Sequence, residues 1–414
     1  MVMETLIYIS IYLGLFIIVF YVLSYFSKPL KEFKEIPDSK LPSVTIVVPA
    51  WNEEKGIGKT IQSLLKIDYP KNKLEILVVD DGSSDKTYEE ALKYKSSQVQ
   101  VFKKKENGGK YTALNFGIER AKGEFIVSTD ADDLEVMPDA LKYMIRYFDD
   151  PNIMCVAPAM AISNPKGILP RVQQVEYLIG VFLRRVFANI NTIHVTPGAF
   201  SAYRKTFIQK TGGFKKAHLT EDMEMALRIQ KYHYKIENSL NSMIYTPGMS
   251  SFMKLLKQRR RWYGGGIRNY YDYRELVSPQ YGILGLLIIP MTFWTIFSII
   301  LFNIYTFFKA FNNLKDQLIF YKSVNFDIFH FEFSSLLIRR AFLIFSTTPL
   351  MLFSFIFIIV LISYMIFAKI WVHKHSKIKL SVLAFILFYS PLSLIWWLDA
   401  IIHSTLLYKK IKWR

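Results

Sequence analysis

Acidic side chains recur directly after short apolar runs of this sequence. The apolar runs cover residues 44–48, 75–80 and 124–129, and the acids that end or follow them are Glu53, Asp80, Asp81, Asp130 and Asp132. Clustered carboxylates with basic neighbours suit a hard divalent cation that also binds phosphate oxygens. Each cluster also has a purely structural interpretation as a helix cap or a solvated turn. Asp130-Ala131-Asp132 therefore indicates a cation site only in combination with the other motifs.

Two later motifs carry further chemistry. Thr220-Glu221-Asp222 precedes a predicted helix at 223–231. A carboxylate held at a helix N-terminus can accept a proton from a hydroxyl, although first-turn acids also simply favour the helix dipole. Gln258-Arg259-Arg260-Arg261-Trp262 follows, and a basic helix anchored by Trp262 among lipid headgroups is the alternative. Lys110, after Gly108-Gly109, marks either an anion site at a helix start or a solvated lysine.

Regular alternation of strands and helices must position these side chains. Four β-branched runs, at 44–48, 75–80, 99–102 and 124–129, alternate with helical patterns at 57–66, 85–95 and 111–121. This rhythm predicts an α/β domain with a mostly parallel sheet and helices on both faces. Ligands of such folds bind at the carboxyl ends of the strands, where the acidic motifs stand.

Long uncharged segments flank this domain. Residues 5–27 are long enough to cross a bilayer, and we expect an uncleaved anchor rather than a signal peptide. Lys28, Lys31 and Lys34 follow it, so the next domain is expected in the cytosol. Further spans are predicted at 278–308, 341–368 and 380–407.

The topology of the last span stays open. Residues 369–379 and the C-terminal tail are both basic and both look cytosolic, which one intervening span does not allow. A re-entrant hairpin at 380–407, broken near Pro391 and Asp399, is one solution, and a partial crossing at 328–342 is another. The amphipathic stretch at 169–189 and the basic residues Lys257, Arg259 and Arg260 are expected to lie on the inner leaflet.

Composition narrows the function classes. The formal net charge of +18 is better explained by basic residues beside apolar spans than by nucleic-acid binding. The only cysteine, Cys155, excludes an intrachain disulfide and lies in an apolar run, so we expect it in the core of a domain in a reduced compartment.

Four motifs occur in a fixed order: Asp80-Asp81-Gly82, Asp130-Ala131-Asp132, Thr220-Glu221-Asp222 and Gln258-x-x-Arg261-Trp262. In this order they resemble the inverting family 2 glycosyltransferases, and among them the processive membrane synthases of hyaluronan, cellulose, chitin and poly-N-acetylglucosamine. The resemblance covers about residues 44–269 and the flanking spans. It implies a GT-A-type, Rossmann-like mixed sheet with a transmembrane region and amphipathic interface helices. The Phe-x-Val-Thr gating segment of cellulose synthases is not found, which argues against a cellulose-type gate and glucose specificity.

The resemblance also implies roles for individual residues. Ala50, Glu53, Asp80 and Asp81 would contact the uridine and Lys110 the nucleotide or its phosphates, while Asp130 and Asp132 would bind donor and metal, with Asp132 the stronger candidate ligand for Mg²⁺ or Mn²⁺. Asp222, beside Glu221, would be the general base. Arg261 would hold the diphosphate, Trp262 would lie under the acceptor sugar, and Gln258 would help to place both. The segment 196–201 with Arg204, including Gly198 and Phe200, matches a donor-sugar or acceptor segment.

The expected organisation is an anchor at 1–28, a cytosolic transferase domain at 40–250, an interface helix at 251–277 and a membrane region of about three spans at 278–414. The expected activity is β-glycosyl transfer from a nucleotide sugar, UDP-GlcNAc first, onto a polysaccharide at the plasma membrane, with chain export and a small accessory membrane subunit as further expectations. Single transfer to a lipid carrier or glycolipid, and a non-catalytic membrane scaffold, are the alternatives.

Overall fold

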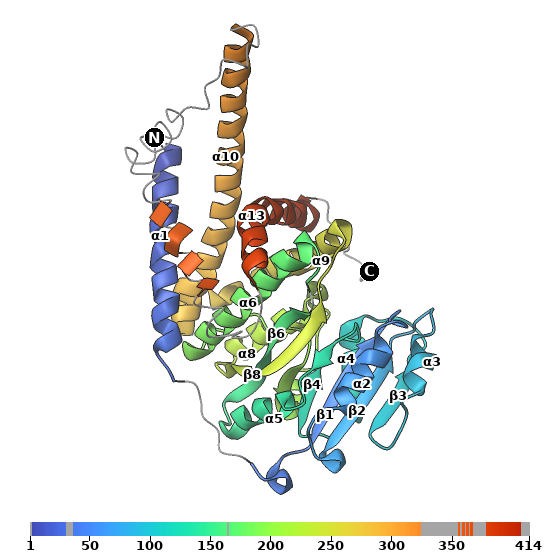
Figure 1. The fold of residues 1–414 in the computed structure, drawn as a ribbon. Coiled ribbons are helices and arrows are strands. Elements are labelled where there is room, and N and C mark those ends of the chain that lie inside the picture. Colours follow the sequence, from blue (N-terminus) through green and yellow to red (C-terminus); the bar gives the residue numbers. More distant parts are fainter. Residues whose placement is uncertain are drawn as a thin grey trace.

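The structure, a computed structural model, describes residues 2–29, 36–163, 165–323 and 378–406, together with positions 355–356, 358–360, 362–363 and 365–366. A mixed eight-stranded sheet forms the centre of the lower part of the molecule, in the order β3-β2-β1-β4-β7-β6-β8-β5 (Figure 1). The strands are β1 (Val44–Ala50), β2 (Leu74–Asp80), β3 (Val99–Lys103), β4 (Phe125–Ser128), β5 (Glu135–Val136), β6 (Ile153–Ser163), β7 (Ser201–Arg204) and β8 (Lys235–Pro247).

Most of the strand pairs are parallel, as the alternation of strands and helices predicts. β1 pairs in parallel with both β2 and β4, β2 with β3, and β6 with β8. β7 is antiparallel to β4 and β6, and β5 is antiparallel to β8. The β-branched residues of the central strands are buried because both faces of the sheet are covered.

Helices cover both faces of this sheet. Alternate residues of β1 enter different cores: Ile46 and Val48 pack with α2 (Ile57–Leu65), whereas Val47 packs with α4 (Lys110–Arg120). The remaining helices of the domain are α3 (Thr87–Leu92), α5 (Ala140–Ile145), α6 (Ile168–Asn189), α7 (Lys205–Lys210), α8 (Glu221–Lys231) and α9 (Phe252–Asp272). Cys155 is fully buried in the second core, as predicted.

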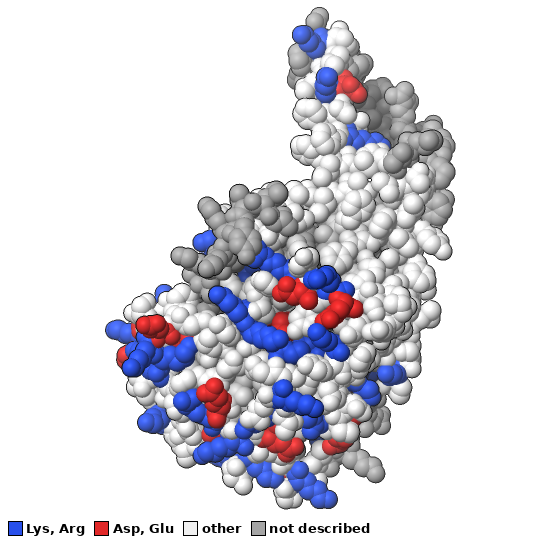
Figure 2. Space-filling view, turned by 180° about the vertical axis from the view of Figure 1, so that it is seen from behind, with Lys and Arg blue, Asp and Glu red and all other residues white. Residues whose placement is uncertain are grey.

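Three described helices are long and apolar enough to cross a membrane. They are α1 (Val2–Phe26), α10 (Ile289–Ser323) and α13 (Lys379–Ile401), with candidate spans Thr5–Phe26, Leu284–Asp316 and Lys379–Ser404. A hydrogen bond of 3.1 Å between Ser10 and Ser298 joins α1 to α10. Figure 2 shows the corresponding column as nearly free of Lys, Arg, Asp and Glu between the basic soluble part and the charged tip of α10.

The soluble domain and the membrane-type helices contact each other mainly through α6 and α9. Tyr25 of α1 stacks on Phe182 of α6 at 4.9 Å, and Asn189 of α6 donates hydrogen bonds to the carbonyls of Ser24 and Tyr25. Ser381 of α13 donates to Gln174 of α6 at 2.6 Å. The sheet is therefore held close beneath the helices.

The last predicted span forms one helix by its hydrogen bonds. α13 continues through Pro391 without interruption and passes at its end into a π-type turn, Ile402–Leu406. Asp399, further along the same helix, is paired with Arg260 of α9. The predicted span at 341–368, the partial crossing at 328–342, Lys31, Lys34, most of the basic loop at 369–379 and the C-terminal tail lie outside the described residues.

Candidate active site

The carboxyl ends of β1 and β2 hold the first two acids in contrasting surroundings. Asp81 is fully buried and accepts from the Lys104 ammonium and from the amides of Gly108 and Gly109 at 3.3 and 2.8 Å. The amides at the start of α4 thus bind a carboxylate of the chain itself. Asp80 is also fully buried; one oxygen accepts from Ser83, and within the described residues Oδ2 has no hydrogen-bond partner.

Burial of Asp80 raises the pKa of its carboxyl, against the opposing effect of the Ser83 hydrogen bonds. A buried polar atom without a partner is costly, so its persistence calls for an explanation by function. Gly82, the next residue but one, has φ of 72°, and a Cβ there would lie 2.9 Å from the Asn107 amide. Only glycine fits this turn, which holds the Asp80-Asp81 pair against the 106–109 loop.

Lys110 lies at the centre of the site. Its ammonium is 2.6 Å from Oδ1 of Asp130, after β4, and 3.4 Å from Oε1 of Glu221, at the start of α8. Burial alone would lower the pKa of Lys110, but the charges of Asp130, Glu221 and Asp222 raise it above its usual value. Lys110 therefore stays protonated and joins α4, the end of β4 and α8.

Asp222 stands in the same group with an unusual protonation equilibrium. Burial raises the pKa of its carboxyl to about 6, the charge of Glu221 adds to this, and Lys110, the Met223 amide and Arg261 oppose it. The backbone of Gly198 passes so close that a Cβ there would lie 2.9 Å from Oδ2 of Asp222 and 3.0 Å from Nζ of Lys110. A carboxyl whose pKa is near neutrality suits acid–base chemistry.

A left-handed loop presents Asp222 to the site. Ala217, His218 and Leu219 all have positive φ, of 41°, 54° and 69°, which is strained for residues with a side chain. Asn269 of α9 donates to the carbonyl and hydroxyl oxygens of Thr220 at 3.2 and 2.8 Å. Gly265 packs so tightly there that a Cβ would lie 2.7 Å from the Thr220 hydroxyl.

Thr220 precedes α8 as its N-cap residue, but its side chain makes no capping hydrogen bond. Its hydroxyl donates to the Ala217 carbonyl instead. The N-terminus of α8 is thus fixed from α9, through the loop that precedes it.

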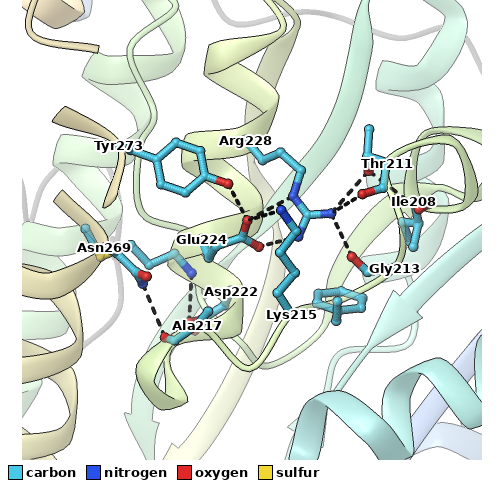
Figure 3. A network of polar contacts seen from close by, with 12 residues as sticks. Ile208, Thr211, Gly213, Lys215, Ala217, Asp222, Glu224, Arg228, Asn269 and Tyr273 are labelled. Atoms are coloured by element: carbon cyan, nitrogen blue, oxygen red, sulfur yellow. Dashed lines mark hydrogen bonds and ion pairs between the residues drawn. The ribbon is translucent and has the colours of Figure 1, made fainter. Parts of the chain in front are cut away.

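A buried polar network fixes the body of α8 (Figure 3). Glu224 is bound by Arg228 one turn later on α8 and by the hydroxyl of Tyr273, and Arg228 reaches the carbonyls of Thr211 and Gly213 at 3.0 and 2.7 Å. Both charged side chains are almost fully buried and satisfied. Removing one partner of such a pair leaves the other charge uncompensated, so the network specifies the position of the helix that carries Asp222.

The three successive arginines of α9 have three different environments. Arg259 is 1% exposed, donates to Glu176 of α6 at 2.5 Å, and lies over the rings of Trp262 and Trp396 at 4.4 and 5.2 Å. Arg260 makes a two-pronged contact with Asp399 of α13. Arg261 makes no hydrogen bond or ion pair to any described residue, and its charge acts on Asp222.

These contacts refine one expectation. Arg259 and Arg260 are not free for lipid headgroups, because each is paired with an acid of another helix. The same holds for Arg185 of α6, which is 3% exposed and donates to the Pro29 carbonyl at 3.1 Å.

Trp262 and Gln258 lie beside the site on the same helix as Arg261. Trp262 is partly buried, with its ring under the Arg259 guanidinium. Within the described parts of the chain, the buried amide oxygen of Gln258 has no hydrogen-bond partner.

The metal candidates lie where β4 ends. The backbone of Asp132 packs against the start of α2, since a Cβ on Gly56 would lie 3.1 Å from its Cα. Asp130 already binds Lys110 through Oδ1. Among the described residues, no three His, Cys, Asp or Glu side chains are grouped so as to hold a metal ion alone. Two carboxylates completed by substrate phosphates and water fit the preference of Mg²⁺.

Some predicted residues are not open to a ligand in this structure. Ala50 and Phe200 are fully buried; the Ala50 carbonyl accepts from the Asp81 amide, and Phe200 has φ of 58°. Arg204 donates to the Phe148 carbonyl at 2.9 Å and lies over the Phe125 and Phe148 rings, which is a structural role. Glu53 is partly exposed, and its amide donates to Thr87 at 2.7 Å.

The structure also adds residues that sequence reasoning missed. Lys104 neutralises Asp81, Asn269 holds Thr220, and Asp399 holds Arg260. Of these three residues, only Asp399 was indicated by the sequence, because it is an acid in an otherwise uncharged predicted span.

Comparison with known proteins accords with this geometry. Residues 45–212 match Glycosyl transferase family 2. The poly-beta-1,6-N-acetyl-D-glucosamine synthase of Staphylococcus aureus is 30% identical over 269 residues, covering 63% of this chain and 64% of that protein. The beta-monoglucosyldiacylglycerol synthase of Trichormus variabilis is 30% identical over 257 residues, 61% of this chain and 54% of that protein. The chain thus spans less than two thirds of the length of these relatives.

A solved structure shares the fold. The mannosyltransferase PcManGT from Pyrobaculum calidifontis, in complex with GDP-Man and Mn²⁺, aligns with a TM-score of 0.55 at 21% identity, covering 66% of this chain and 75% of its own. The sheet order, the parallel β1–β2–β3 segment and the antiparallel β7 belong to a GT-A fold. Residues 45–212 thus match the model of glycosyltransferase family 2, and the sheet that they share has a GT-A fold, joined to helices long and apolar enough to cross a membrane.

Proposed function

We propose that this chain moves a sugar from a nucleotide-sugar donor, UDP-GlcNAc before UDP-glucose or GDP-mannose, onto an acceptor hydroxyl at the membrane, with inversion at the anomeric carbon. The observation that carries this proposal is the meeting of Lys110, Asp130, Asp222 and Arg261 at the carboxyl ends of the strands. Base, donor-binding acid and phosphate-binding cation are the three groups that a single displacement needs.

Asp222 acts as the base in this proposal. The acceptor hydroxyl attacks the anomeric carbon from the side opposite the nucleotide, a C–O bond forms as the bond to the diphosphate breaks, and Asp222 takes the hydroxyl proton. A pKa of about 6 keeps the carboxylate largely ionised at neutral pH while making it more basic than an ordinary Asp. One displacement converts an α-linked donor into a β-linked product.

The leaving diphosphate is stabilised by Arg261, whose guanidinium is not used by any described residue, and by Lys110 nearby. A divalent cation held by Asp132 and Asp130 would supply Lewis-acid stabilisation of the same charge. The balance of charge supports a metal. The acids of the site outnumber its cations: Asp130, Asp132, Glu221 and Asp222 stand against Lys110 and Arg261. A diphosphate entering without a cation would meet net repulsion.

The nucleoside would lie over the Asp80-Asp81 turn. The oxygen of Asp80 without a partner can accept from the N–H of a uracil ring, and Lys104 with the α4 amides holds Asp81 in place beside it. Neither Ala50 nor Phe200 needs to move if contacts in this region are made by main-chain atoms.

The acceptor defines two candidate products. One 30% identical relative is named for a polysaccharide and another for a glycolipid, so we propose chain elongation first and single transfer to a lipid second. Purified protein in nanodiscs, given each labelled nucleotide sugar with Mn²⁺, will produce a ladder of oligosaccharides in the first case and one organic-soluble product in the second. Absence of turnover with every donor would refute the proposal.

The proposed orientation rests on the charge pattern. Lys28 after α1 and the nearby basic domain support a site on the cytosolic face of the plasma membrane, from which a growing chain would leave through the spans. Protection of the soluble domain from protease in right-side-out vesicles, and cleavage in inverted ones, tests this orientation. Dependence on an accessory subunit is tested by the activity of the chain purified alone.

A further inference from the structure

Asp399 is an acid within a membrane-type helix. It is the only acidic residue of α13, in a candidate span that runs from Lys379 to Ser404. A carboxylate at such a position costs free energy unless it is paired, and paired intramembrane charges commonly mark function. The proposed reaction does not use it directly.

Its partner lies on the helix that carries the active-site arginine. Nε and Nη2 of Arg260 donate to the two oxygens of Asp399 at 2.7 and 2.8 Å. The side chains are 28% and 15% exposed, and His403, one turn further along, lies 3.3 Å from the same carboxylate. Two parallel charge-assisted hydrogen bonds fix direction as well as distance.

The neighbouring arginine is fixed toward another helix. Arg259 binds Glu176 of α6, and burial raises the pKa of that carboxyl while Arg259 opposes the rise. Successive residues on an α-helix point about 100° apart. Two ion pairs to two different helices therefore define the rotation of α9 about its own axis, and with it the direction in which Arg261 points.

α9 also contacts α13 and the π-type turn that follows it, Ile402–Leu406, at two further points. Tyr263 stacks on Trp397 with ring centres 4.1 Å apart, and Arg268 donates to the Ser404 carbonyl at 2.8 Å. α13 thus contacts α9 on both sides of Arg261 and Trp262.

We propose that Asp399 is a positioning residue for sugar transfer: from within the membrane-type helix α13 it orients α9 through Arg260, so that Arg261 faces the diphosphate and Trp262 the acceptor. This inference rests on the function proposed above. Activity then depends on an ion pair with the membrane-type helix, although Asp399 touches no substrate. Loss of the pair removes one of the contacts that set the rotation of α9, and small misplacements of a reacting group are costly.

A double-mutant cycle tests the proposal. Asp399→Asn, Arg260→Gln and the double variant are compared in nanodiscs for turnover of UDP-GlcNAc, affinity for UDP with Mn²⁺, and melting temperature. Each single variant is expected to lower kcat by roughly tenfold to a hundredfold, with a smaller change in donor KM, because Arg261 acts most on the charge that grows in the transition state. The double variant should fall no further than either single one.

Rescue separates positioning from simple destabilisation. The exchanged pair, Asp399→Arg with Arg260→Asp, and the conservative Asp399→Glu should recover most of the lost kcat. Glu275→Gln is the matched control, because it breaks an exposed 2.5 Å pair with Lys231, and it should leave kcat unchanged. If Asp399→Asn does not fold, the kcat values of Asp399→Glu and of the exchanged pair still show whether activity depends on this ion pair.

Three results would overturn the inference: additive effects in the cycle, no rescue by either restored pair, or loss of activity only in step with melting. Wild-type protein that turns over no donor at all would instead refute the proposed function, so the two failures are distinguishable.

Discussion

Replacement of Asp222 by asparagine probes the centre of the proposed mechanism. The amide keeps the size of the side chain and can still accept the hydrogen bond that the Met223 amide donates at 2.8 Å, but it cannot take a proton. A positioned general base contributes about 10² to 10⁴ in rate, which corresponds to about 3–5 kcal/mol of activation free energy.

Donor binding should survive this change. Asparagine removes a negative charge that stands beside Glu221, so the affinity for UDP with Mn²⁺ should be equal or higher, and the melting temperature should not fall. The assay is turnover of a saturating nucleotide sugar, with calorimetric titration of UDP on the same preparation. Asp139→Asn, at an exposed position, is the control and should behave as wild type. Turnover of Asp222→Asn within about threefold of wild type would refute the assignment, since no base effect is that small.

The remaining predictions concern pH, the loop, the central lysine and the metal. kcat/KM should rise with pH through about 6 and level off above it. Because the pKa of Asp222 is raised in the folded protein, the free energy of unfolding is greatest when this carboxyl is protonated, and it falls by up to about 3 kcal/mol as the pH rises from about 4 to 6. Asp222→Asn should remove this pH dependence of the free energy of unfolding. Gly265→Ala should displace Thr220 and lower kcat at least about tenfold. An unchanged circular dichroism spectrum is the control that the variant is folded. Lys110→Met should leave three carboxylates without their shared cation and lower the melting temperature as well as turnover; a melting temperature equal to wild type would contradict that account. Chelation should abolish transfer. Asp132→Asn should weaken Mn²⁺ binding in calorimetry performed with UDP present, and unchanged affinity would exclude Asp132 as a ligand.

Local signals explain why much of the fold was predictable. The runs that became β1 and β2 are β-branched and continuous, as expected of strands buried on both faces, and the acids that follow them meet because parallel strands end at one edge. α4 begins at Lys110, after Gly109 with φ of 92°, as the Gly-Gly pair indicated.

Other features depend on contacts that no local pattern encodes. Arg259 and Glu176 are 83 residues apart in sequence, and Arg260 and Asp399 are 139 apart, so composition alone made the arginines look like a lipid-facing surface. The left-handed turn at Ala217–Leu219 contains no glycine or asparagine, so the local sequence does not predict it. It persists because α9 binds the loop from outside, which is tertiary structure overriding local preference.

The length of α10 has a consequence for experiments on sidedness. Its 35 residues extend about 52 Å, whereas the hydrocarbon of a bilayer is about 30 Å thick. Figure 1 shows its far end rising beyond α1 and α13, and exposed lysines stand along that end at positions 309, 315 and 322. Lysine in hydrocarbon costs about 3 kcal/mol, so this end belongs in water. An impermeant amine reagent applied to intact cells would therefore test the proposed orientation, because labelling of these lysines is expected only if the catalytic domain lies on the cytosolic side.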